Sequence, residues 1–290
     1  MILYPEDFGA VGDGIADDTA AIQSCIDAGG IIQLSSSYGI SKTGQDPLFG
    51  TSYRLWINKS DISIKYLNLT GSIGIRYSRH VNIIHNVFQS GTIWGGIIPR
   101  YVLVDGNTLL NTYDGINGDG ARYWRITNNV IQNSRKSGIT IQANLDQGSE
   151  SGQSSHCTII GNRVIKWAQD KKGGVGIQLN GANYCEVADN YLLNNDASSY
   201  GIRVKSWSQP RGKATSNRNH IHDNYILTYY AGNRAFDVLG EDASVFDGQP
   251  NPCKKNLINS NFAEGFVNFA VIGQQADDNQ ITDNYNNCRN

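Results

Sequence analysis

The chain has 290 residues, of which 17% are charged, and its formal net charge is −2. A nearly neutral chain has no excess of positive charge with which to attract nucleic acid, so we expect no nucleic-acid partner. No apolar run approaches the ~20 residues that span a membrane, so we expect no membrane partner. The N-terminus lacks the charged-then-apolar pattern of a signal peptide. The cysteines lack metal-ligand spacing, and we expect them to be buried free thiols: Cys25, Cys157, Cys185, Cys253 and Cys288.

The first predicted element is a short helix over residues 17–29. Acidic residues stand at its start, and Gly29 stands at its end, as is common for helices. An amphipathic helix of this kind covers the open end of a repeat structure. We therefore expect residues 1–30 to form an N-terminal capping segment.

The rest of the chain repeats one pattern: a β-branched aliphatic residue, two further residues, and then asparagine. The asparagines are Asn86, Asn107, Asn129, Asn162, Asn190, Asn224, Asn261 and Asn284. The aliphatic residues three positions earlier are Ile83, Val104, Ile126, Ile159, Val187, Ile221, Ile258 and Ile281. The shortest spacings between these asparagines are 21 to 23 residues, which we interpret as one bare coil.

This pattern predicts stacked coils of short strands. Alternation with a period of two places the aliphatic side chains on one face, and asparagine suits the turn between two strands. Coils about 4.8 Å apart allow each buried amide to bond to the next one, which removes the cost of burying it. The fold class is therefore all-β: a right-handed parallel β-helix with an asparagine ladder, forming a single domain with coils over residues 55–290.

A second strand signature lies between the ladder positions. It reads Gly115-Ile116, Gly138-Ile139-Thr140-Ile141, Gly176-Ile177-Gln178-Leu179 and Gly201-Ile202-Arg203-Val204. Longer insertions predict loops near 143–156, 166–174, 206–218 and 240–255. Cys157 and Cys185 each stand five residues before a ladder asparagine, so we expect them to stack in the core.

Residues 8–23 also carry a resemblance to a known family. Phe8-Gly9-Ala10-Val11-Gly12-Asp13-Gly14, followed by Asp17-Asp18-Thr19-Ala20-Ala21-Ile22-Gln23, resembles the N-terminal signature of the pectate-lyase-like superfamily. That superfamily includes phage tailspikes, pectin-degrading enzymes and mannuronan C5-epimerases. The resemblance implies the β-helix fold, but one scaffold hosts several reactions, so the function has to come from the site.

The outward positions of the second strand signature form a polar stripe. One row is Asn117, Thr140, Gln178, Arg203 and Asp237, and a second row is Asp119, Gln142, Asn180 and Lys205. Aromatic residues flank both rows: Tyr113, Tyr200, Trp207, Tyr229 and Tyr230. Aromatic platforms combined with amides and charges suit a sugar polymer, and the stripe predicts a glycan-binding trough.

Arg203 and Lys205 suggest an anionic substrate, because they place two cations on one face of a nearly neutral protein. In β-elimination of a uronate, Arg203 would neutralise the carboxylate and Lys205 would remove the adjacent C5 proton. His220 and His222 face outward on the following strand, and we expect either to assist with a proton.

Comparison with the polygalacturonases of the superfamily argues against one type of reaction. Arg203-Val204-Lys205 and Tyr113-Asp114-Gly115 resemble motifs of polygalacturonases, but no paired aspartates stand near residues 137–141, and Val175 replaces their histidine. Inverting hydrolysis needs two carboxylates, so this type of hydrolysis is disfavoured.

Two other enzyme types resemble parts of the chain. Lys205-Ser206 and the following coil are similar to β-helical alginate and chondroitin lyases, with His222 where those have arginine. Those lyases use Ca²⁺, for which Asp237, Glu241 and Asp242 offer oxygens. The epimerase tetrad of Tyr, Asp, His and Asp aligns loosely with Tyr113, Asn117, Asp119 and Gln142, of which one matches.

The leading hypothesis is a polysaccharide depolymerase that cleaves an acidic glycan by β-elimination. The alternatives are hydrolysis by Asp119 with Asp146 or Glu150, and a non-catalytic glycan-binding or structural virion module. The tailspike resemblance further implies an extracellular or virion-associated protein and a homotrimer.

Overall fold

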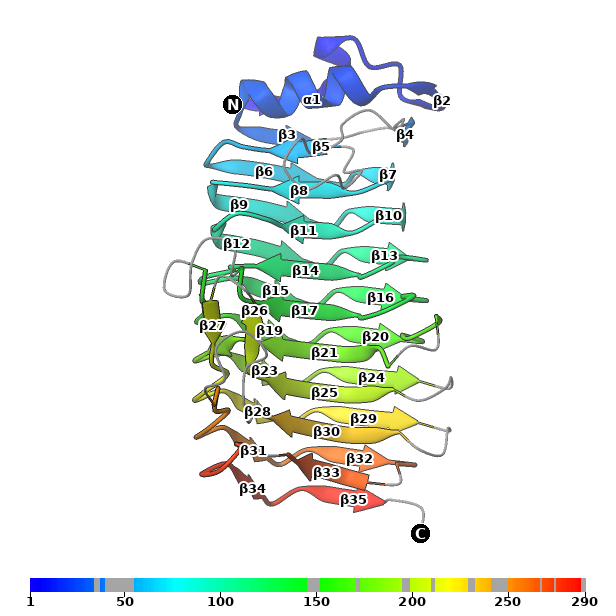
Figure 1. Ribbon diagram of the computed structural model, residues 1–290. Coiled ribbons are helices and arrows are strands. Elements are labelled where there is room, and N and C mark those ends of the chain that lie inside the picture. The colour runs from blue at the N-terminus through cyan, green and yellow to red at the C-terminus, as the bar shows by residue number, and fades with distance from the viewer. Residues whose placement is uncertain are drawn as a thin grey trace.

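Successive coils of the chain stack along one axis, with helix α1 at the N-terminal end, in the computed structural model (Figure 1). The structure describes residues 1–33, 37–39, 55–144, 152–170, 173–194, 199–209, 212–228, 233–240, 250–266, 268–273 and 275–287. Each complete coil contributes one strand to each of three parallel sheets, here named A, B and C. This is the predicted right-handed parallel β-helix.

The strands fall into the three sheets as follows. Sheet A contains β1 (Ile2–Leu3), β3 (Ile31–Gln33), β6 (Ile62–Lys65), β9 (Arg79–Ile84), β12 (Arg100–Asp105), β15 (Arg125–Thr127), β19 (Thr158–Ile160), β23 (Glu186–Ala188), β28 (His220–His222), β31 (Leu257–Asn259) and β34 (Gln280–Thr282). Sheet B contains β2 (Asp13–Asp17), β4 (Ser37–Gly39), β7 (Asn68–Thr70), β10 (Val87–Ser90), β13 (Thr108–Leu110), β16 (Val130–Gln132), β20 (Arg163–Ile165), β24 (Tyr191–Asn194), β29 (Tyr225–Thr228), β32 (Phe262–Glu264) and β35 (Tyr285–Asn287). Sheet C contains β5 (Leu55–Ile57), β8 (Ile73–Ile75), β11 (Ile93–Gly95), β14 (Ile116–Asp119), β17 (Ile139–Gln142), β21 (Val175–Asn180), β25 (Tyr200–Lys205), β30 (Arg234–Leu239) and β33 (Asn268–Ile272).

Two short strand pairs lie outside these sheets. β18 (Ser154–Ser155) pairs with β22 (Ala182–Asn183), and β26 (Trp207–Gln209) pairs antiparallel with β27 (Gly212–Ala214). The second pair is a hairpin inside residues 206–218, which the sequence predicted as a loop. The insertion therefore adds a short antiparallel strand pair, and its Trp207 lines the pocket on sheet C.

The asparagine ladder stands at the corner between sheets A and B. The side-chain Nδ2 of Asn107 donates to Oδ1 of Asn129 at 2.9 Å, and the backbone N–H of Asn107 donates to the same oxygen. This double contact recurs from Asn86 through to Asn284. The predicted ladder is confirmed, and it satisfies amides that are almost fully buried.

A second ladder, which the sequence analysis missed, lies at the corner between sheets C and A. Asn219 donates to Asn256, and Asn256 donates to Asn279, at 2.9 and 2.8 Å. The backbone N–H of Cys185 donates to Oδ1 of Asn219. Each of these asparagines stands five residues before a main-ladder asparagine, in the position that Cys157 and Cys185 fill in earlier coils. This constant offset of five residues is the sequence pattern from which the second ladder could have been predicted.

The N-terminal segment closes the solenoid as predicted. Helix α1 (Thr19–Ala28) follows the short 3-10 helix η1 (Pro5–Phe8) and buries Ile22, Cys25 and Ile26 against the first coil. The carboxylate of Asp18 accepts the backbone N–H groups of Val11 and Gly12, so it fastens the glycine-rich loop to the start of the helix. No helix in the described part of the chain is long and apolar enough to cross a membrane.

The core is aliphatic along the whole stack, with inward Ile, Val and Leu side chains almost fully buried. Cys25, Cys157, Cys185 and Cys253 are buried free thiols, as predicted, and Cys288 lies outside the described residues. Burial raises the pKa of the Cys253 thiol to about 12, so this sulfur stays protonated.

We predict that Asn129→Ala lowers the free energy of unfolding by at least about 3 kcal/mol, because both donors of Asn107 lose their acceptor and Asn162 loses the side-chain donor while it keeps the backbone one. Urea unfolding followed by tryptophan fluorescence measures this value. Asn284→Ala is the matched control at the ladder's end, where Asn284 is only partly buried and no described rung follows. Its expected loss is about 1 kcal/mol. Equal losses at the two positions would contradict the ladder's role.

Candidate functional site

The outward face of sheet C carries the two predicted polar rows. Strand pairing places Asn117 beside Thr140, Thr140 beside Gln178, and Gln178 beside Arg203. The second row follows the same register through Asp119, Gln142, Asn180 and Lys205. The predicted register is confirmed.

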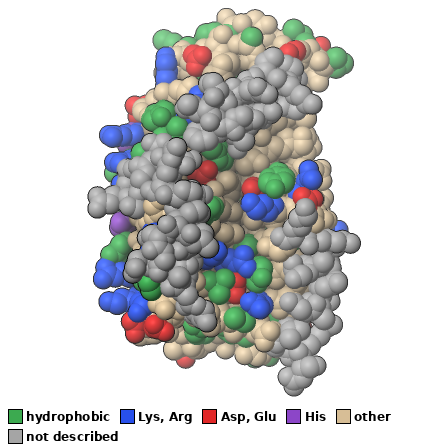
Figure 2. Space-filling view, viewed as in Figure 1, with side chains coloured by type: hydrophobic (Ala, Val, Ile, Leu, Met, Phe, Trp, Pro, Cys, Tyr) green, Lys and Arg blue, Asp and Glu red, His purple; other side chains and the backbone are tan. Residues whose placement is uncertain are grey.

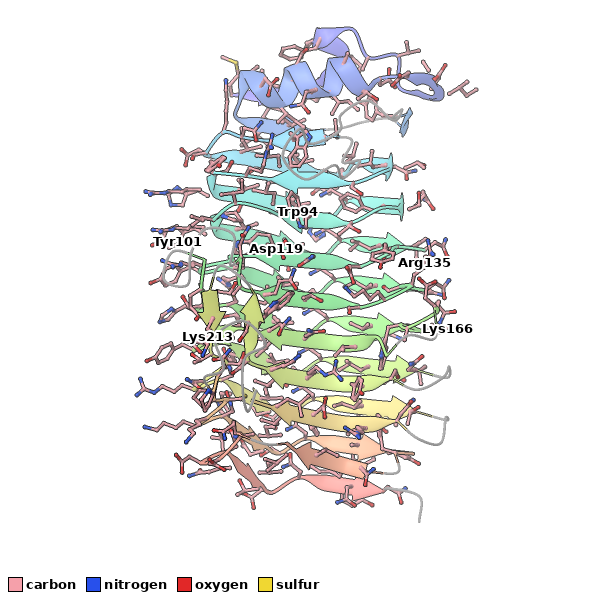
Figure 3. The ribbon with its side chains drawn as sticks, in the orientation of Figure 1. Trp94, Tyr101, Asp119, Arg135, Lys166 and Lys213 are labelled. Carbon is pink, nitrogen blue, oxygen red and sulfur yellow. The ribbon has the colours of Figure 1, made fainter. Side chains whose placement is uncertain are left out.

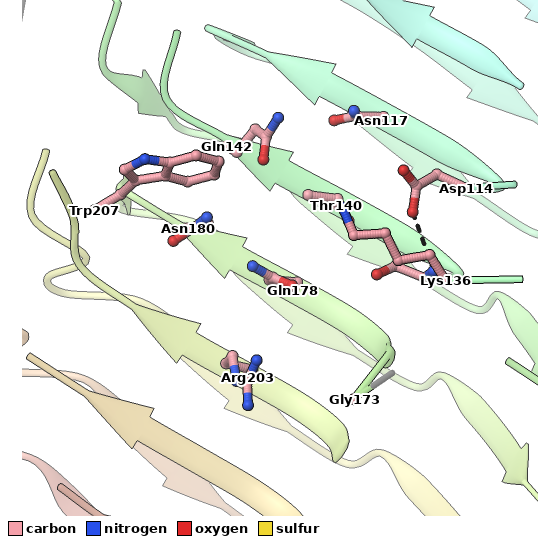
Figure 4. A pocket seen from close by; sticks show the side chains of 11 residues that line it. Asp114, Asn117, Lys136, Thr140, Gln142, Gly173, Gln178, Asn180, Arg203 and Trp207 are labelled. Carbon is pink, nitrogen blue, oxygen red and sulfur yellow. Dashed lines mark hydrogen bonds between the residues drawn. The ribbon is translucent and has the colours of Figure 1, made fainter. Parts of the chain in front are cut away.

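A pocket of about 210 Å³ opens on this face (Figure 4). It is smaller than the roughly 300–1,000 Å³ of pockets for drug-sized ligands, and its size suits one sugar ring. Its lining comes from strands β14, β17, β21 and β25, from the segments before them, and from hairpin residue Trp207. The lining residues are Asp114, Asn117, Lys136, Ser137, Thr140, Gln142, Gly173, Gln178, Asn180, Arg203 and Trp207.

Two asparagine oxygens in this lining have no hydrogen-bond partner. Oδ1 of Asn117 and Oδ1 of Asn180 are buried and unsatisfied within the described structure. Asn180 is only 6% exposed. A buried acceptor without a donor costs about 1–3 kcal/mol, so these atoms mark a place where a ligand with hydroxyl donors would be stabilised.

Arg203 is held in place by a buried carboxylate. Its Nε donates to Oδ2 of Asp237 at 2.8 Å, and Nη1 of Arg234 donates to Oδ1 of Asp237 at 3.1 Å. Its guanidinium carbon stands 3.6 Å from the ring centre of Tyr200. The cluster of two arginines and one aspartate keeps a net positive charge at the pocket edge.

This cluster corrects two predicted substrate contacts. Asp237 is fully buried beneath the arginines, so it positions Arg203 and does not meet a ligand directly. The ring of Tyr200 is covered by Arg203, and Arg234 lies 5.8 Å from the same ring. A sugar could therefore not stack on the face of Tyr200 that Arg203 occupies.

Asp114 and Lys136 line the pocket but were not predicted as site residues. Burial raises the pKa of Asp114, although nearby Lys136 and hydrogen bonds from Ser137 oppose the shift. The backbone N–H of Ser137 donates to Oδ1 of Asp114 at 3.0 Å. Both residues precede strands at the corner between sheets B and C, two residues after the stacked pair Thr112 and Ser134, whose hydroxyls lie 3.0 Å apart.

Asp119 lies next to the pocket behind Gln142. Nε1 of Trp94 donates to its Oδ2 at 3.0 Å, and Nε2 of Gln142 donates to its Oδ1. Burial raises the pKa of Asp119 to about 7, and these two hydrogen bonds oppose the rise. This carboxyl is therefore close to half protonated near neutral pH.

Of the other predicted residues on this face, some line the pocket and one does not. Gln142, Gln178 and Trp207 line the pocket. Lys205 pairs with Asn180 on the predicted face, but it is absent from the lining. Its role as a base stays a prediction.

His220 and His222 lie on strand β28 of sheet A, a different sheet from the pocket. Nε2 of His220 contacts Asn259, while His222 bridges Asp223 and Glu186 at 2.7 and 3.2 Å. These carboxylates raise the pKa of His222 in spite of the opposing effect of burial. The expectation that they serve the Arg203 site is wrong, because the strand after the corner turns away from sheet C.

No three His, Cys, Asp or Glu side chains among the described residues could hold a metal ion together. Of the oxygens expected for Ca²⁺, Asp237 is committed to two arginines. Glu241 and Asp242 lie outside the described residues, as do Asp146, Glu150, Tyr229 and Tyr230.

The fold is shared with solved structures of low sequence identity. The surface protein and adhesin PfbA of Streptococcus pneumoniae is 15% identical, with a TM-score of 0.67 over 100% of this chain and 98% of that one. A mutant tailspike protein of Escherichia coli bacteriophage HK620, in complex with a hexasaccharide, is 14% identical, with a TM-score of 0.57. That match covers 99% of this chain and 57% of the tailspike chain. No curated protein matches the sequence significantly.

A sequence profile described as "Periplasmic copper-binding protein (NosD)" matches residues 32–233, which is more than half of the chain. These residues include the coils that carry the pocket and most of the asparagine ladder. The chain belongs to the NosD family of β-helix proteins.

Proposed function

We propose that the pocket on sheet C binds one sugar of an acidic glycan and that the protein cleaves this glycan by β-elimination. The observation that carries the proposal is the pair of unsatisfied oxygens of Asn117 and Asn180 in a pocket that also holds Arg203 and Lys136. Sugar hydroxyls would donate to these oxygens, and the Arg203 guanidinium would hold a carboxylate. Trp207 offers an aromatic wall beside them.

Arg203 is suited to neutralise the substrate carboxylate. Its Nε is committed to Asp237, and the stacking on Tyr200 fixes the plane of the guanidinium, so its terminal nitrogens are presented in one orientation. A neutralised carboxylate makes the neighbouring C5 proton more acidic. Because Arg203 is already held in place, its positive charge would stabilise the negative charge that develops as the C5 proton leaves.

We assign the base to Lys136, because it is the lysine that lines the pocket. In its neutral form it would take the C5 proton, the C4–C5 double bond would form, and the C4–O bond to the leaving sugar would break. Water would protonate the leaving oxygen, and the Lys136 ammonium would return its proton to the solvent. The sequence-based assignment of the base to Lys205 is the competing outcome of the same experiment.

The comparisons support a glycan partner and a location outside the cytoplasm. The HK620 tailspike was solved with a hexasaccharide, PfbA is a surface adhesin, and the NosD family is described as periplasmic. We propose an extracellular or surface-exposed protein on these grounds. The assembly into a homotrimer and the placement on a phage tail rest on the tailspike resemblance and stay predictions.

The copper named in the family description does not fit the described residues. Four cysteines are buried in the core, and no group of three metal-binding side chains exists among the residues that the structure covers. The chain contains a single methionine, Met1. Soft copper sites depend on converging thiolate, thioether or imidazole ligands, so we propose no copper chemistry.

A second candidate reaction is hydrolysis, which the raised pKa values of Asp114 and Asp119 favour. A carboxyl that stays protonated near neutral pH suits a general acid. Hydrolysis produces saturated reducing ends, whereas elimination produces unsaturated ends that absorb ultraviolet light. A glycan-binding protein without activity would bind and yield neither product.

We predict that a panel of uronate polymers includes one from which the protein releases ultraviolet-absorbing ends, and that Lys136→Gln lowers this rate at least about 100-fold. Lys205→Gln is the matched control on the same face, and we expect it to keep at least a third of the rate. Loss of activity in Lys205→Gln alone would move the base to Lys205. Saturated ends would replace elimination by hydrolysis.

The pKa of Asp119 predicts a pH dependence of stability that needs no substrate. Between its ordinary value of 3.8 and about 7, the folded protein keeps a proton that the unfolded chain releases, so ionisation of Asp119 destabilises the fold as pH rises through this window. Asp119→Asn removes the effect. We expect its unfolding free energy, relative to the original protein, to increase from pH 4.5 to 7.5.

Urea unfolding at pH 4.5, 6.0 and 7.5 measures this difference. Asp13→Asn is the control, because hydrogen bonds from Ala16 and Ile15 lower the pKa of Asp13 and put its effect below this pH range. Parallel curves for Asp119→Asn and the original protein would show that Asp119 titrates normally.

A further inference from the structure

A second cavity adjoins the pocket on sheet C. Its volume is about 160 Å³, and its lining residues are Tyr113, Arg135, Lys136, Asp170 and Gly174. Lys136 lines both cavities, and Asp114 of the pocket directly follows Tyr113 in the chain. The two cavities therefore meet at Lys136, at the corner between sheets B and C, and we name the second one the corner cavity.

Tyr113 gives the corner cavity an open aromatic surface. Its side chain is 54% exposed. Cζ of Arg135 and Nζ of Lys136 lie 5.6 and 6.0 Å from the ring centre, near the outer limit of a cation–π contact. Arg203, in contrast, stands 3.6 Å from the ring of Tyr200. The ring of Tyr113 is therefore available for stacking, with polar groups beside it, as in pockets that bind sugars.

Arg135 supplies hydrogen-bond donors beside this ring. Its Nε donates to Oδ1 of Asp170 at 3.0 Å, and the backbone N–H of Asp170 donates to the carbonyl oxygen of Arg135, also at 3.0 Å. These contacts hold the guanidinium next to Tyr113 and leave its terminal nitrogens as donors. Because a guanidinium forms strong hydrogen bonds with a carboxylate, the corner cavity suits an acidic sugar.

The polar row of the pocket ends at bulky groups in both directions along the solenoid axis. On one side, Trp94 pairs with Asn117 and is only 6% exposed, so it offers a sugar almost no surface. On the other side, Arg203 and Arg234 both bind the buried carboxylate of Asp237. The corner cavity instead continues the pocket across the strands, past Lys136.

The figures show how the two cavities follow one another across the sheet. In Figure 4, Trp207 stands at one end of the pocket and Lys136 at the opposite end, with strands of sheet C running between them. Figure 3 labels Arg135 at the right edge of the molecule, with Asp119 between it and Lys213 of the hairpin on the left. Viewed from the same side, Figure 2 shows an exposed hydrophobic side chain bordered by basic and acidic ones on the right-hand part of this face.

We propose that the corner cavity binds a second sugar of the acidic glycan, so that the glycan crosses the strands of sheet C. The assignment deepens, and rests on, the proposed function of the pocket. In β-elimination the bond that breaks joins C4 of the uronate to the neighbouring sugar, and C4 is next to C5, from which Lys136 takes the proton. Since Lys136 lies between the two cavities, the sugar that leaves is the one on Tyr113.

The test compares uronates of one and two sugars: galacturonate with digalacturonate, and mannuronate with dimannuronate. Stopped-flow tryptophan fluorescence follows binding within the first second, because Trp207 lines the pocket. In at least one series, we expect the disaccharide to bind at least about fivefold more tightly than the monosaccharide, because it adds a contact with an aromatic ring.

Tyr113→Ala should remove most of this gain and leave the binding of the monosaccharide unchanged, whereas Tyr113→Phe keeps the ring and should keep the gain. The matched control is Tyr77→Ala, which removes another exposed tyrosine, from the turn between β8 and β9. It should bind both sugars as the original protein does. Thermal unfolding of all three variants should match that of the original protein, because both tyrosines are exposed.

The outcomes distinguish the corner cavity from the pocket. If a monosaccharide binds but the second sugar brings no gain, or if Tyr113→Ala keeps the gain, the corner cavity is not a subsite, and the proposed function of the pocket is untouched. If Tyr113→Ala weakens both sugars equally, or Tyr77→Ala loses the gain as well, the role of Tyr113 is overturned. If no monosaccharide and no disaccharide binds, both proposals fall.

Discussion

In-register stacking of parallel strands is the constraint on which the rest of this molecule depends. Each coil donates its backbone hydrogen bonds to the next, so a side chain is fixed directly above its counterpart one coil away. For asparagine this repetition is favourable, because the amide is both donor and acceptor, and the ladder from Asn86 to Asn284 results. The same geometry therefore stabilises the core and arranges the outward side chains in rows on the surface.

The register of the site could be read from the sequence for the same reason. Inward and outward positions alternate, and a slip of one residue would bury polar side chains all along the stack, so the aliphatic residues near the ladder fix every strand. This is why Asn117, Gln178 and Arg203 were placed correctly on one face of sheet C. The ladder at Asn219, Asn256 and Asn279 was also readable, since it keeps a constant offset of five residues from the main one.

What the sequence left undetermined is how neighbouring side chains pair once they share a face. The alternation of inward and outward side chains along the strand predicts that Asp237 points outward, but only the structure shows it buried between Arg203 and Arg234. His220 and His222 were placed on the following strand and expected to reach the Arg203 site, but that strand, β28, belongs to sheet A and carries them away from the pocket. Asp114 and Lys136 lie before strands, in turns whose length varies between coils and which therefore carry no periodic signal.

The pocket and the corner cavity use polar groups in different physical regimes. Burial removes solvent from Asn180 in the pocket and from Asp119 next to it, so each unmet hydrogen bond or displaced proton there has a large effect and selects one chemical group. Arg135 in the corner cavity is exposed to water and salt, so an ion pair there contributes little, and the ring of Tyr113 has to supply most of the contact. A solenoid supplies both conditions at once, because the face of a sheet, where side chains stand close together, ends at a corner where they reach into the solvent.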